Sequence, residues 1–295
     1  MIKINYKPYE IKHFPDGSQR LMDFDIDNYV TSYTDGFNIT WLYEDDSEMI
    51  TIFYLVNHIR SHVVRGVNYI ELTLPYVPNS RMDRVKNDKE VFTLKYFCDF
   101  INSLNFNKVN VYDTHSYVTD ALINNINKLS VGMVLYSIKF AIDYNYDLIY
   151  FPDDGAMKRY KDLIINAFPK TNIIYGKKDR DWDTGQIKGI KIFNEKEELC
   201  TENDIRDKKI LMIDDIISYG GTMAYSADKL HEMKASLIDI YTSHLENSFF
   251  DKEKGTLRKR MENDTKIVNT IYTTNSIFNE KYNVDNFNIK VIEKF

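Results

Sequence analysis

The sequence contains few residues of the kinds that cross-link or interrupt a polypeptide. Its 295 residues include 2 cysteines, 6 prolines and 11 glycines. Cys98 and Cys200 belong to no CxxC pair and to no Cys/His pattern with metal-ligand spacing, so these cysteines indicate no zinc site. Two cysteines in ordinary surroundings are typical of a reduced compartment, and we expect a cytoplasmic protein.

Long apolar runs and an excess of basic charge are also missing. No apolar run approaches the roughly 18 residues of a membrane span, and residues 1–20 carry charges throughout, unlike a secretory signal. The 38 lysines and arginines are outnumbered by 44 aspartates and glutamates, which gives a net charge of -6. We therefore expect no membrane partner and no nucleic-acid partner, whereas a small anionic substrate would need only a local cluster of cations.

Short, β-branched apolar runs alternate with longer segments of helical period, which is the pattern of α/β proteins with parallel sheets. The expected strands lie at 67–75, 108–113, 146–151, 171–176, 208–215 and 235–244, and the expected helices at 47–64, 90–104, 157–168 and 222–233. The pattern restarts near residue 140, and the length suits two domains, 1–140 and 141–295. The charged runs KRYKDLIINAFPK (158–170) and NEKEELCTEND (194–204) are interpreted as solvated faces without a function.

The stretch LMIDDIISYGGTM (211–223) places two acidic residues at the end of an apolar strand and two glycines before a helix. Open α/β sheets bind ligands at the carboxyl ends of their strands. A glycine-containing loop that opens a helix offers backbone N–H groups to an anion, and carboxylates accept hydrogen bonds from vicinal hydroxyls, so a sugar phosphate suits both features. The alternative is an edge loop without a ligand, in which Thr222 caps the helix. No GK[ST] follows the glycines, which excludes a Walker A loop.

This stretch resembles the phosphoribosyl-diphosphate binding motif of type I phosphoribosyltransferases and ribose-phosphate diphosphokinases. Two segments of the first half resemble the diphosphokinases in particular. PYVPNSRMDR (75–84) is similar to their nucleotide-binding PYxxxxRxDR segment, which implies an ATP-binding role for Arg81, Asp83 and Arg84. VYDTHS (111–116) is similar to their D-x-H segment, which implies that His115 contacts magnesium and ATP. Without the resemblance, RxDR could be a surface salt-bridge loop, and Asp113 with His115 a cap and a hydrogen-bonded histidine.

Three further segments carry the same resemblance. YFPDDGAMKR (150–159) is similar to the S-P-D-x-G strand end, where Asp153 takes the metal-linked position. YGKKDRDWDTGQI (175–187) is similar to the catalytic loop with its K-x-R pair, here Lys178 and Arg180. KHFPDGSQ (12–19) is similar to the F-x-D-G-E segment, which implies that Phe14 and Asp16 help to hold adenine.

The resemblance is thus to class I ribose-phosphate diphosphokinases and runs from about residue 12 to 245. It implies two tandem type I phosphoribosyltransferase-like α/β domains, each a mainly parallel sheet flanked by helices, with the ATP site in 1–140 and the ribose 5-phosphate site in 141–295. The implied enzyme transfers the diphosphoryl group of ATP to the 1-hydroxyl of ribose 5-phosphate, with Mg²⁺ as cofactor, and works as a homo-oligomer, either a dimer or a hexamer.

The resemblance also implies a role for each matched residue. Lys178, Arg180 and His115 are expected to be catalytic, and His115 and Asp153 to hold the metal. The expected ribose 5-phosphate-binding residues are Asp214, Asp215, Ser218, Tyr219, Gly220, Gly221 and Thr222.

The chain departs from the family pattern at four positions. Ser18 stands where the family usually has Glu, Met82 replaces a common Gln, and Ser218 and Tyr219 replace a frequent Asp-Thr pair. Two alternatives follow: a phosphoribosyltransferase that consumes phosphoribosyl diphosphate, and a non-catalytic regulatory homologue of the synthetase. The first would need neither the RxDR nor the K-x-R segment, and the second would not need His115, Lys178 or Arg180.

Overall fold

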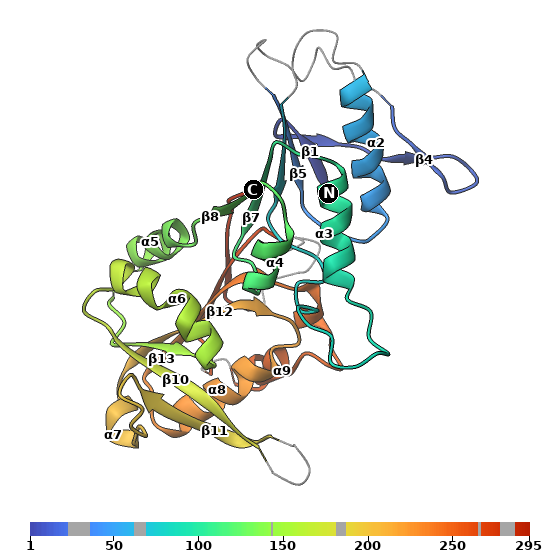
Figure 1. The fold of residues 1–295 in the computed structure, drawn as a ribbon. Helices are drawn as coiled ribbons and strands as arrows, with labels where there is room; N and C mark the ends of the chain where they lie inside the picture. Colours follow the sequence, from blue (N-terminus) through green and yellow to red (C-terminus); the bar gives the residue numbers. More distant parts are fainter. Residues whose placement is uncertain (23–35, 62–68, 143, 181–186, 265–266, 278–286) are drawn as a thin grey trace. The chain divides into compact units, whose positions relative to one another are not determined.

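The structure is a computed structural model that describes residues 1–22, 36–61, 69–142, 144–180, 187–264, 267–277 and 287–295. It divides into two compact units, Met1–Ser130 with Phe295 (unit 1) and Val131–Lys294 (unit 2) (Figure 1). The sequence pattern predicts a boundary at residue 140. In the structure helix α5 (Gly132–Ala141) lies in unit 2, because its Tyr136 hydroxyl and Lys139 ammonium donate to the Asn166 and Ala167 carbonyls at 3.1 and 2.6 Å.

Unit 1 contains a six-stranded sheet in the order β2-β1-β5-β6-β7-β8. The strands are β1 (Ile2–Ile4), β2 (Lys7–Tyr9), β5 (Phe37–Trp41), β6 (Ile70–Leu74), β7 (Lys108–Tyr112) and β8 (Ile126–Leu129). Strands β5 to β8 run parallel, whereas β1 pairs antiparallel with both β2 and β5. A separate small hairpin is formed by β3 (Lys12–His13) and β4 (Gln19–Arg20).

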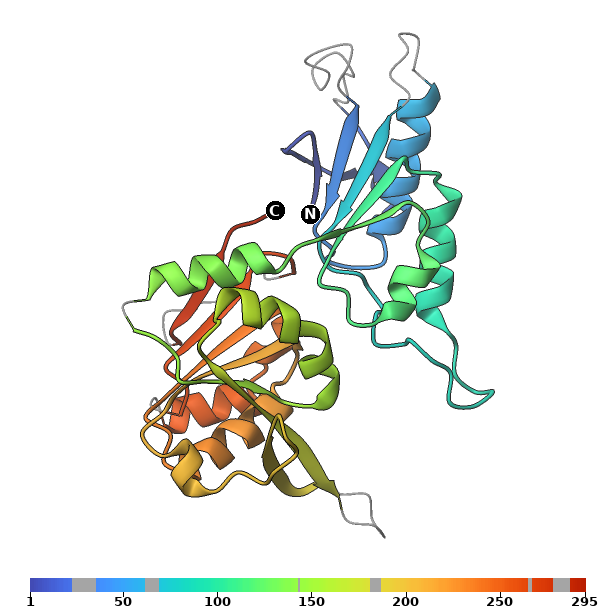
Figure 2. The same ribbon diagram turned by 60° about the vertical axis from the view of Figure 1, so that its left-hand side comes forward.

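The helices of unit 1 are α2 (Glu48–Ser61), α3 (Thr93–Ser103) and α4 (Tyr117–Leu122). Each connects two neighbouring parallel strands, and the strands advance in one direction across the sheet. Because such crossovers are right-handed, the three helices lie on the same side of the sheet, as Figure 2 shows. The apolar core of unit 1 fills the space between them and includes Trp41, Ile52, Leu72, Phe97 and Val111.

Unit 2 contains a seven-stranded sheet in the order β11-β10-β9-β12-β13-β14-β15. The strands are β9 (Leu148–Phe151), β10 (Asn172–Arg180), β11 (Ile187–Asn194), β12 (Lys209–Ile217), β13 (Leu237–Leu245), β14 (Thr270–Thr274) and β15 (Ile289–Ile292). All neighbours pair in parallel except β10 and β11, which are antiparallel. The helices are α5, α6 (Asp154–Ala167), α7 (Glu202–Ile205), α8 (Gly221–Glu232) and α9 (Thr256–Asn263), with a 3₁₀ turn at Asn247–Phe250.

The strand order of unit 2 reverses between β9 and β12. From β9 the chain moves outward to β10, and it later returns to β12 on the other side of β9 and continues to β13. Right-handed crossovers in opposite directions place α6 and α8 on opposite faces of the sheet. Accordingly, Phe151 stacks on Tyr160 of α6, whereas the hydroxyl of its neighbour Tyr150 lies 2.8 Å from the Ser226 hydroxyl of α8. The carboxyl ends of β9 and β12 are therefore the expected ligand-binding edge.

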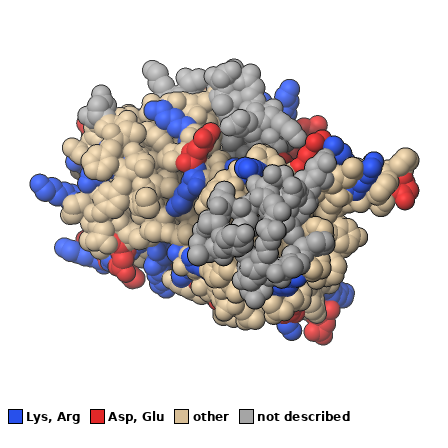
Figure 3. Space-filling view, turned by 90° about the horizontal axis from the view of Figure 1, so that it is seen from above, with Lys and Arg blue, Asp and Glu red and all other residues tan. Residues whose placement is uncertain are grey.

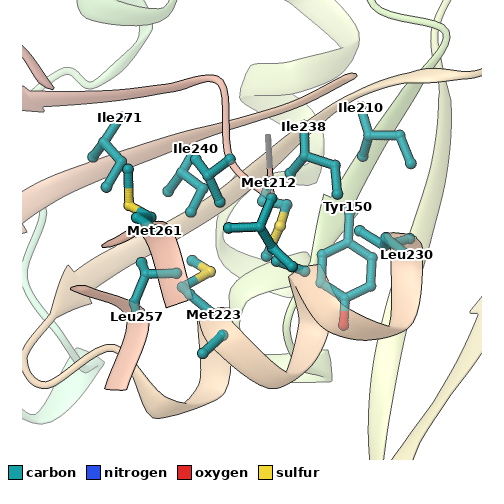
Figure 4. Close-up of a cluster of buried hydrophobic side chains, with 14 of the residues drawn as sticks. Tyr150, Ile210, Met212, Met223, Leu230, Ile238, Ile240, Leu257, Met261 and Ile271 are labelled. Carbon is teal, nitrogen blue, oxygen red and sulfur yellow. The ribbon is translucent and has the colours of Figure 1, made fainter. Parts of the chain in front are cut away.

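The core of unit 2 lies between the sheet and helices α8 and α9. Met212 and Ile240 from neighbouring strands face Met223 and Leu230 of α8, and Leu257 and Met261 of α9 close the same cluster (Figure 4). Because this apolar layer packs α8 against the sheet, it holds the N-terminus of α8 close to the carboxyl end of β12.

A buried carboxylate lies at the opposite, amino-terminal edge of the same sheet. Asp239 of β13 has an exposed fraction of 0% and accepts hydrogen bonds from the hydroxyls of Tyr144 and Tyr146 at 2.5 and 2.7 Å. The side-chain amide of Asn269 donates a third hydrogen bond at 2.9 Å. Three donors satisfy this carboxylate within the protein.

The predicted fold class, mainly parallel sheets flanked by helices, is confirmed, with local differences. Strand β12 extends to Ile217, two residues beyond the predicted end at 215, so Asp214 and Asp215 lie inside the strand rather than at its end. Helix α6 begins at Asp154, three residues earlier than predicted, because the Asp153 side chain caps it. Within the described part of the chain, each helix is too short or too polar to cross a membrane.

Candidate functional site

The two carboxylates at the carboxyl end of β12 have different surroundings. Successive side chains of a strand leave on opposite faces of a sheet. Asp215 lies on the α6 face with an exposed fraction of 2%, and Asp214 lies on the α8 face and is half-buried. The Asp214 carboxylate accepts a hydrogen bond from the backbone N–H of Asp215 at 3.0 Å. The two groups are adjacent in the chain but are not equivalent sites for a ligand.

The electrostatics of the pair are also unequal. Burial is the largest cause that raises the pKa of Asp214 well above 3.8, and the carboxylates of Asp215 and Asp153 add to it. Asp215 is paired with Arg159 of α6, whose Nη1 lies 3.1 Å from the Asp215 Oδ2. The negative charge of Asp215 is thus compensated within the protein, whereas ionised Asp214 gains from a hydroxyl or a cation brought by a ligand.

Arg159 contradicts the interpretation of 158–170 as a solvated face. Its side chain is 22% exposed and reaches from α6 to the buried Asp215. Ala156, Tyr160 and Ile164 form the buried stripe of α6, and Arg159 lies three residues after Ala156, on the flank of that stripe. This spacing is the signal in the sequence that would have placed Arg159 toward the sheet.

The loop between β12 and α8 is held in a fixed conformation by α9. The Tyr219 carbonyl accepts hydrogen bonds from the backbone N–H groups of Thr256 and Leu257 at 2.7 and 3.2 Å. Gly220 has φ +75° and precedes the first residue of α8, and a Cβ at this position would lie 2.5 Å from the Leu257 Cβ. A residue with a side chain therefore does not fit at Gly220. The first residues of α8, Gly221 and Thr222, begin a helix whose N-terminus can receive an anion.

The structure shows the surroundings of three positions in this loop, Gly220, Ser218 and Tyr219. The helix cap is Gly220 and not Thr222, which is the second residue of α8. The Ser218 hydroxyl lies 3.0 Å from the Ser248 hydroxyl, and Ser248 donates in turn to Glu246 at 3.2 Å. Tyr219 is 39% exposed, so its side chain lies at the surface beside the loop.

Asp153 lies at the carboxyl end of β9, the strand next to β12. Its carboxylate accepts a hydrogen bond from the Ala156 N–H at 3.0 Å and caps α6, while the residue stays exposed. Asp153 and Asp214 together offer carboxylate oxygens, the donor type that Mg²⁺ prefers, so the residues present fit this ion. Among the described residues, no three His, Cys, Asp or Glu side chains form a group that could hold a metal by themselves. The other expected ligand, His115, belongs to unit 1.

Unit 1 places the expected nucleotide-binding residues after two neighbouring parallel strands. Arg81, Asp83 and Arg84 follow β6, and His115 follows β7. Arg84 is 79% exposed at its side chain, and its Nε lies 3.8 Å from the Asp83 carboxylate. Since β6 and β7 are parallel neighbours, both segments lie at one edge of the sheet. The structure therefore brings the RxDR and D-x-H segments to the same edge.

Phe14 and Asp16 lie in the turn of the β3–β4 hairpin, which is separate from this edge. The Asp16 carboxylate accepts hydrogen bonds from the Ser18 N–H and hydroxyl at 2.9 and 2.7 Å, and these bonds lower the pKa of Asp16. The guanidinium of Arg20 lies over the Phe14 ring at 5.4 Å. Ser18, the departure from the family's Glu, thus closes the turn.

Lys178 and Arg180 form the end of β10, where their backbones pair with Ile190 and Ile187 of β11, and the register shifts between Asp179 and Arg180. The side chains of Lys178 and Arg180 lie outside the described residues, as do residues 181–186 of the same segment. On the face drawn in Figure 3, described lysine and arginine side chains are dispersed among neutral and acidic ones.

Comparison with known proteins gives a family. The model of the phosphoribosyl transferase domain matches residues 119–286, more than half of the chain. A ribose-phosphate pyrophosphokinase of Pyrococcus abyssi is 25% identical over 290 residues, which cover 97% of this chain and 90% of that protein. One of Thermococcus kodakarensis is 25% identical over 238 residues, covering 80% and 76%.

A solved structure shows the same fold over nearly the whole chain. The phosphoribosylpyrophosphate synthetase of Mycobacterium smegmatis superimposes with a TM-score of 0.71 at 14% identity, covering 97% of this chain and 86% of that one. The match extends over the residues of both units. The chain therefore belongs to the phosphoribosyl transferase domain family, within its ribose-phosphate pyrophosphokinases.

Proposed function

We propose that this protein transfers the diphosphoryl group of ATP to the 1-hydroxyl of ribose 5-phosphate, giving AMP and 5-phosphoribosyl 1-diphosphate. The observation that carries the proposal is the carboxyl edge of β9 and β12, where a half-buried carboxylate and a rigid glycine loop share one segment of chain. The relatives named ribose-phosphate pyrophosphokinase support the reaction.

The sugar phosphate would use both halves of this segment. The Asp214 carboxylate, beside the backbone of Asp215, accepts hydrogen bonds from the ribose hydroxyls. The backbone N–H groups of Gly221 and Thr222, with the Ser218 hydroxyl, receive the 5-phosphate at the N-terminus of α8. Because α9 holds Tyr219 and Gly220 in place, little ordering of the loop is needed when the phosphate binds.

Unit 1 would bind the nucleotide. The exposed guanidinium groups of Arg81 and Arg84 suit polyphosphate oxygens, and His115 lies at the same edge of the sheet. Phe14 and Asp16 of the hairpin would contact adenine, as the resemblance implies. Lys178 and Arg180 would stabilise the charge of the transferring group.

Magnesium would be held by Asp153 and His115. When bound, Mg²⁺ neutralises phosphate oxygens and orients them for displacement. The protein's own contribution is positioning: diphosphoryl transfer needs no covalent intermediate with the enzyme, only aligned reactants and compensated charge. The proposal includes a cytoplasmic homo-oligomer, dimeric or hexameric, whose assembly sedimentation equilibrium would measure.

Phosphorus NMR of the protein with ATP, Mg²⁺ and ribose 5-phosphate tests the reaction. We expect AMP and phosphoribosyl diphosphate to form together, without ADP. Intact ATP would refute the proposal. A second sample with phosphoribosyl diphosphate and purine or pyrimidine bases would then separate the alternatives, since consumption indicates a phosphoribosyltransferase and silence a non-catalytic homologue.

A further inference from the structure

The acidic pair of β12 is divided between the two faces of the sheet. Asp215 points to the α6 face and is 2% exposed, whereas Asp214 belongs to the face that carries α8 and the glycine loop. Only Asp214 shares a face with the helix N-terminus that would receive the phosphate. The two carboxylates therefore cannot both serve the same sugar in the same way.

Arg159 is positioned to serve Asp215. Its Nη1 lies 3.1 Å from the Asp215 Oδ2, and its Cζ lies 5.6 Å from the centroid of the Tyr160 ring. Tyr160 is fully buried and stacks on Phe151 of β9, so the aromatic surface under the guanidinium is anchored to the sheet. The guanidinium of Arg159 thus contacts both a buried carboxylate and an aromatic ring that packs on the sheet, a combination that suits arginine better than lysine.

We infer that Arg159 is a positioning residue of the sugar site: by pairing with Asp215 on the α6 face, it leaves Asp214 as the carboxylate that accepts hydrogen bonds from the ribose hydroxyls. This inference rests on the proposed function and assigns a division of labour within its acidic pair. Arg159 itself does not contact the substrate.

The physical reason is the balance of charge around two adjacent acids. A buried carboxylate that loses its cation is strongly disfavoured. Without Arg159, the charge of Asp215 would act unbalanced on Asp214, whose carboxylate already accepts a hydrogen bond from the Asp215 N–H at 3.0 Å. The Asp214 side chain would then leave the position that suits the sugar. If Asp215 were replaced by a neutral residue as well, the position would carry no negative charge that acts on Asp214, and Arg159 would not be needed to balance it.

The test compares ribose 5-phosphate binding in three variants of the full-length protein, by isothermal titration calorimetry. Arg159→Met, which keeps the length of the side chain, is expected to raise the Kd of ribose 5-phosphate at least about tenfold. The double variant Arg159→Met/Asp215→Asn is expected to return to within about threefold of wild type, because it buries no unpaired charge. Lys158→Met is the matched control, an exposed cation on the same helix, and should bind as wild type.

A folded Arg159→Met protein with the wild-type Kd would overturn the inference. So would a folded double variant that binds as weakly as the single one, because Arg159 would then act by another route. Circular dichroism and thermal unfolding establish folding, and if Arg159→Met fails to fold, the double variant decides alone. The KM of ATP should change by less than about twofold in the folded variants, since a general structural defect would alter both substrates.

The measurement also separates this inference from the proposed reaction. Wild-type protein that binds ribose 5-phosphate but forms no AMP would refute the reaction, while the comparison of Kd values would still decide the role of Arg159. Wild-type protein that does not bind ribose 5-phosphate would refute both.

Discussion

Asp214 is a carboxyl group whose surroundings favour its neutral form in the ligand-free protein. Burial and the neighbouring Asp215 raise its pKa above 3.8, so the folded chain holds a proton that the unfolded chain releases. The stability that this group contributes is therefore complete below about pH 4 and is lost as the pH rises through the raised value. A ligand hydroxyl or a cation would offset that loss, which ties stability to binding at this residue.

Replacing Asp214 with Asn should have opposite effects on ribose 5-phosphate binding and on the stability of the folded protein. We expect Asp214→Asn to weaken ribose 5-phosphate binding about 100-fold, since it removes a charged acceptor. At pH 7.5 the ligand-free variant should unfold at least about 2 °C higher than wild type, which corresponds to about 1 kcal/mol. Urea unfolding from pH 4 to pH 8 should show wild type losing stability relative to the variant as the pH rises.

Asp162→Asn is the matched control, because it removes one negative charge from an exposed position of α6. It should change neither binding nor the dependence of stability on pH. A destabilised Asp214→Asn protein at neutral pH would contradict the assigned electrostatics.

Gly220 should be intolerant of any side chain. At φ +75° a non-glycine residue costs about 1–2 kcal/mol, and its Cβ would also press on Leu257 at 2.5 Å. We expect Gly220→Ala to lower the free energy of unfolding by at least about 2 kcal/mol and to raise the KM of ribose 5-phosphate. Chemical denaturation and steady-state kinetics measure the two effects.

Gly221→Ala provides the comparison in stability. A Cβ at Gly221 meets no atom within 4 Å, and the residue opens α8 in a helical conformation. Alanine there should leave stability unchanged or raise it by about 0.5–1 kcal/mol. Equal stability of the two alanine variants would show that the loop is not held as described.

Some site residues can be predicted from the sequence and others cannot. The acidic pair and the glycines were identified because their types are rare at the end of an apolar strand. Arg159 was not, because its role depends on α6 crossing the face of the sheet on which Asp215 lies, and a charged helix reads as solvated until its neighbours are known. The same holds for Leu257, which lies against Gly220 in the loop between β12 and α8 although it is 37 positions later in the chain.

Helix α6 begins at a residue with two proposed tasks. The Asp153 carboxylate caps the helix through the Ala156 N–H at 3.0 Å, and the same carboxylate is the proposed magnesium ligand. Asn is as good a cap as Asp but a far weaker ligand for Mg²⁺. We expect Asp153→Asn to keep the wild-type melting temperature and to lose Mg²⁺-dependent AMP formation.

Asp153→Ala should lose both properties, with a destabilisation of about 1 kcal/mol from the missing cap. Thermal unfolding and AMP formation at several Mg²⁺ concentrations distinguish the two substitutions. Full activity in the asparagine variant would remove Asp153 from the metal site.

Elements with a strong local pattern were predictable. The apolar runs of β6, β7, β9, β12 and β13 appear within a few residues of their expected places. The central strands of unit 2, such as β9, are apolar along their length because they are buried on both faces, whereas β6 alternates buried and half-buried residues. The three-residue strands β1 and β2 and the antiparallel edge strand β11 were missed. Strands β1 and β2 are too short to show a recognisable alternation, and the pairing of β11 with β10 depends on a partner that lies elsewhere in the sequence.

In the whole molecule, the residues proposed to bind ATP belong mainly to unit 1, and those proposed to bind ribose 5-phosphate belong to unit 2. His115 belongs to unit 1 and Asp214 to unit 2, so substitutions at the two residues should damage different properties. His115→Ala should keep the Kd of ribose 5-phosphate within about twofold of wild type and reduce kcat at least about 100-fold. Calorimetry and AMP formation provide the two measurements.

His231→Ala, at an exposed position in the last turn of α8, is the control for removal of a histidine. It should match wild type in both measurements. A His115→Ala protein with the wild-type kcat would exclude His115 from the reaction, and one with weakened sugar binding would show that its effect is not confined to the nucleotide.

At this scale the family was recognisable from the order of six short segments, although no single segment was specific. The fold comparison extends over 97% of the chain at 14% identity, which shows how little of the sequence the architecture requires. The boundary between the two units is harder to predict from the sequence. Helix α5 is apolar on most of its surface, so its residue pattern does not show which unit it packs against.

Asp239 lies at the amino-terminal edge of the unit 2 sheet and Asp214 at its carboxyl edge, and we expect the two positions to vary differently during evolution. Asp239 is satisfied by Tyr144, Tyr146 and Asn269, all of them encoded by the same gene, so this group can be exchanged as a set for an apolar one. The proposed partner of Asp214 is a metabolite, which cannot mutate in compensation. Among close relatives we expect positions 144, 146, 239 and 269 to vary together, while position 214 stays acidic for as long as the reaction is selected.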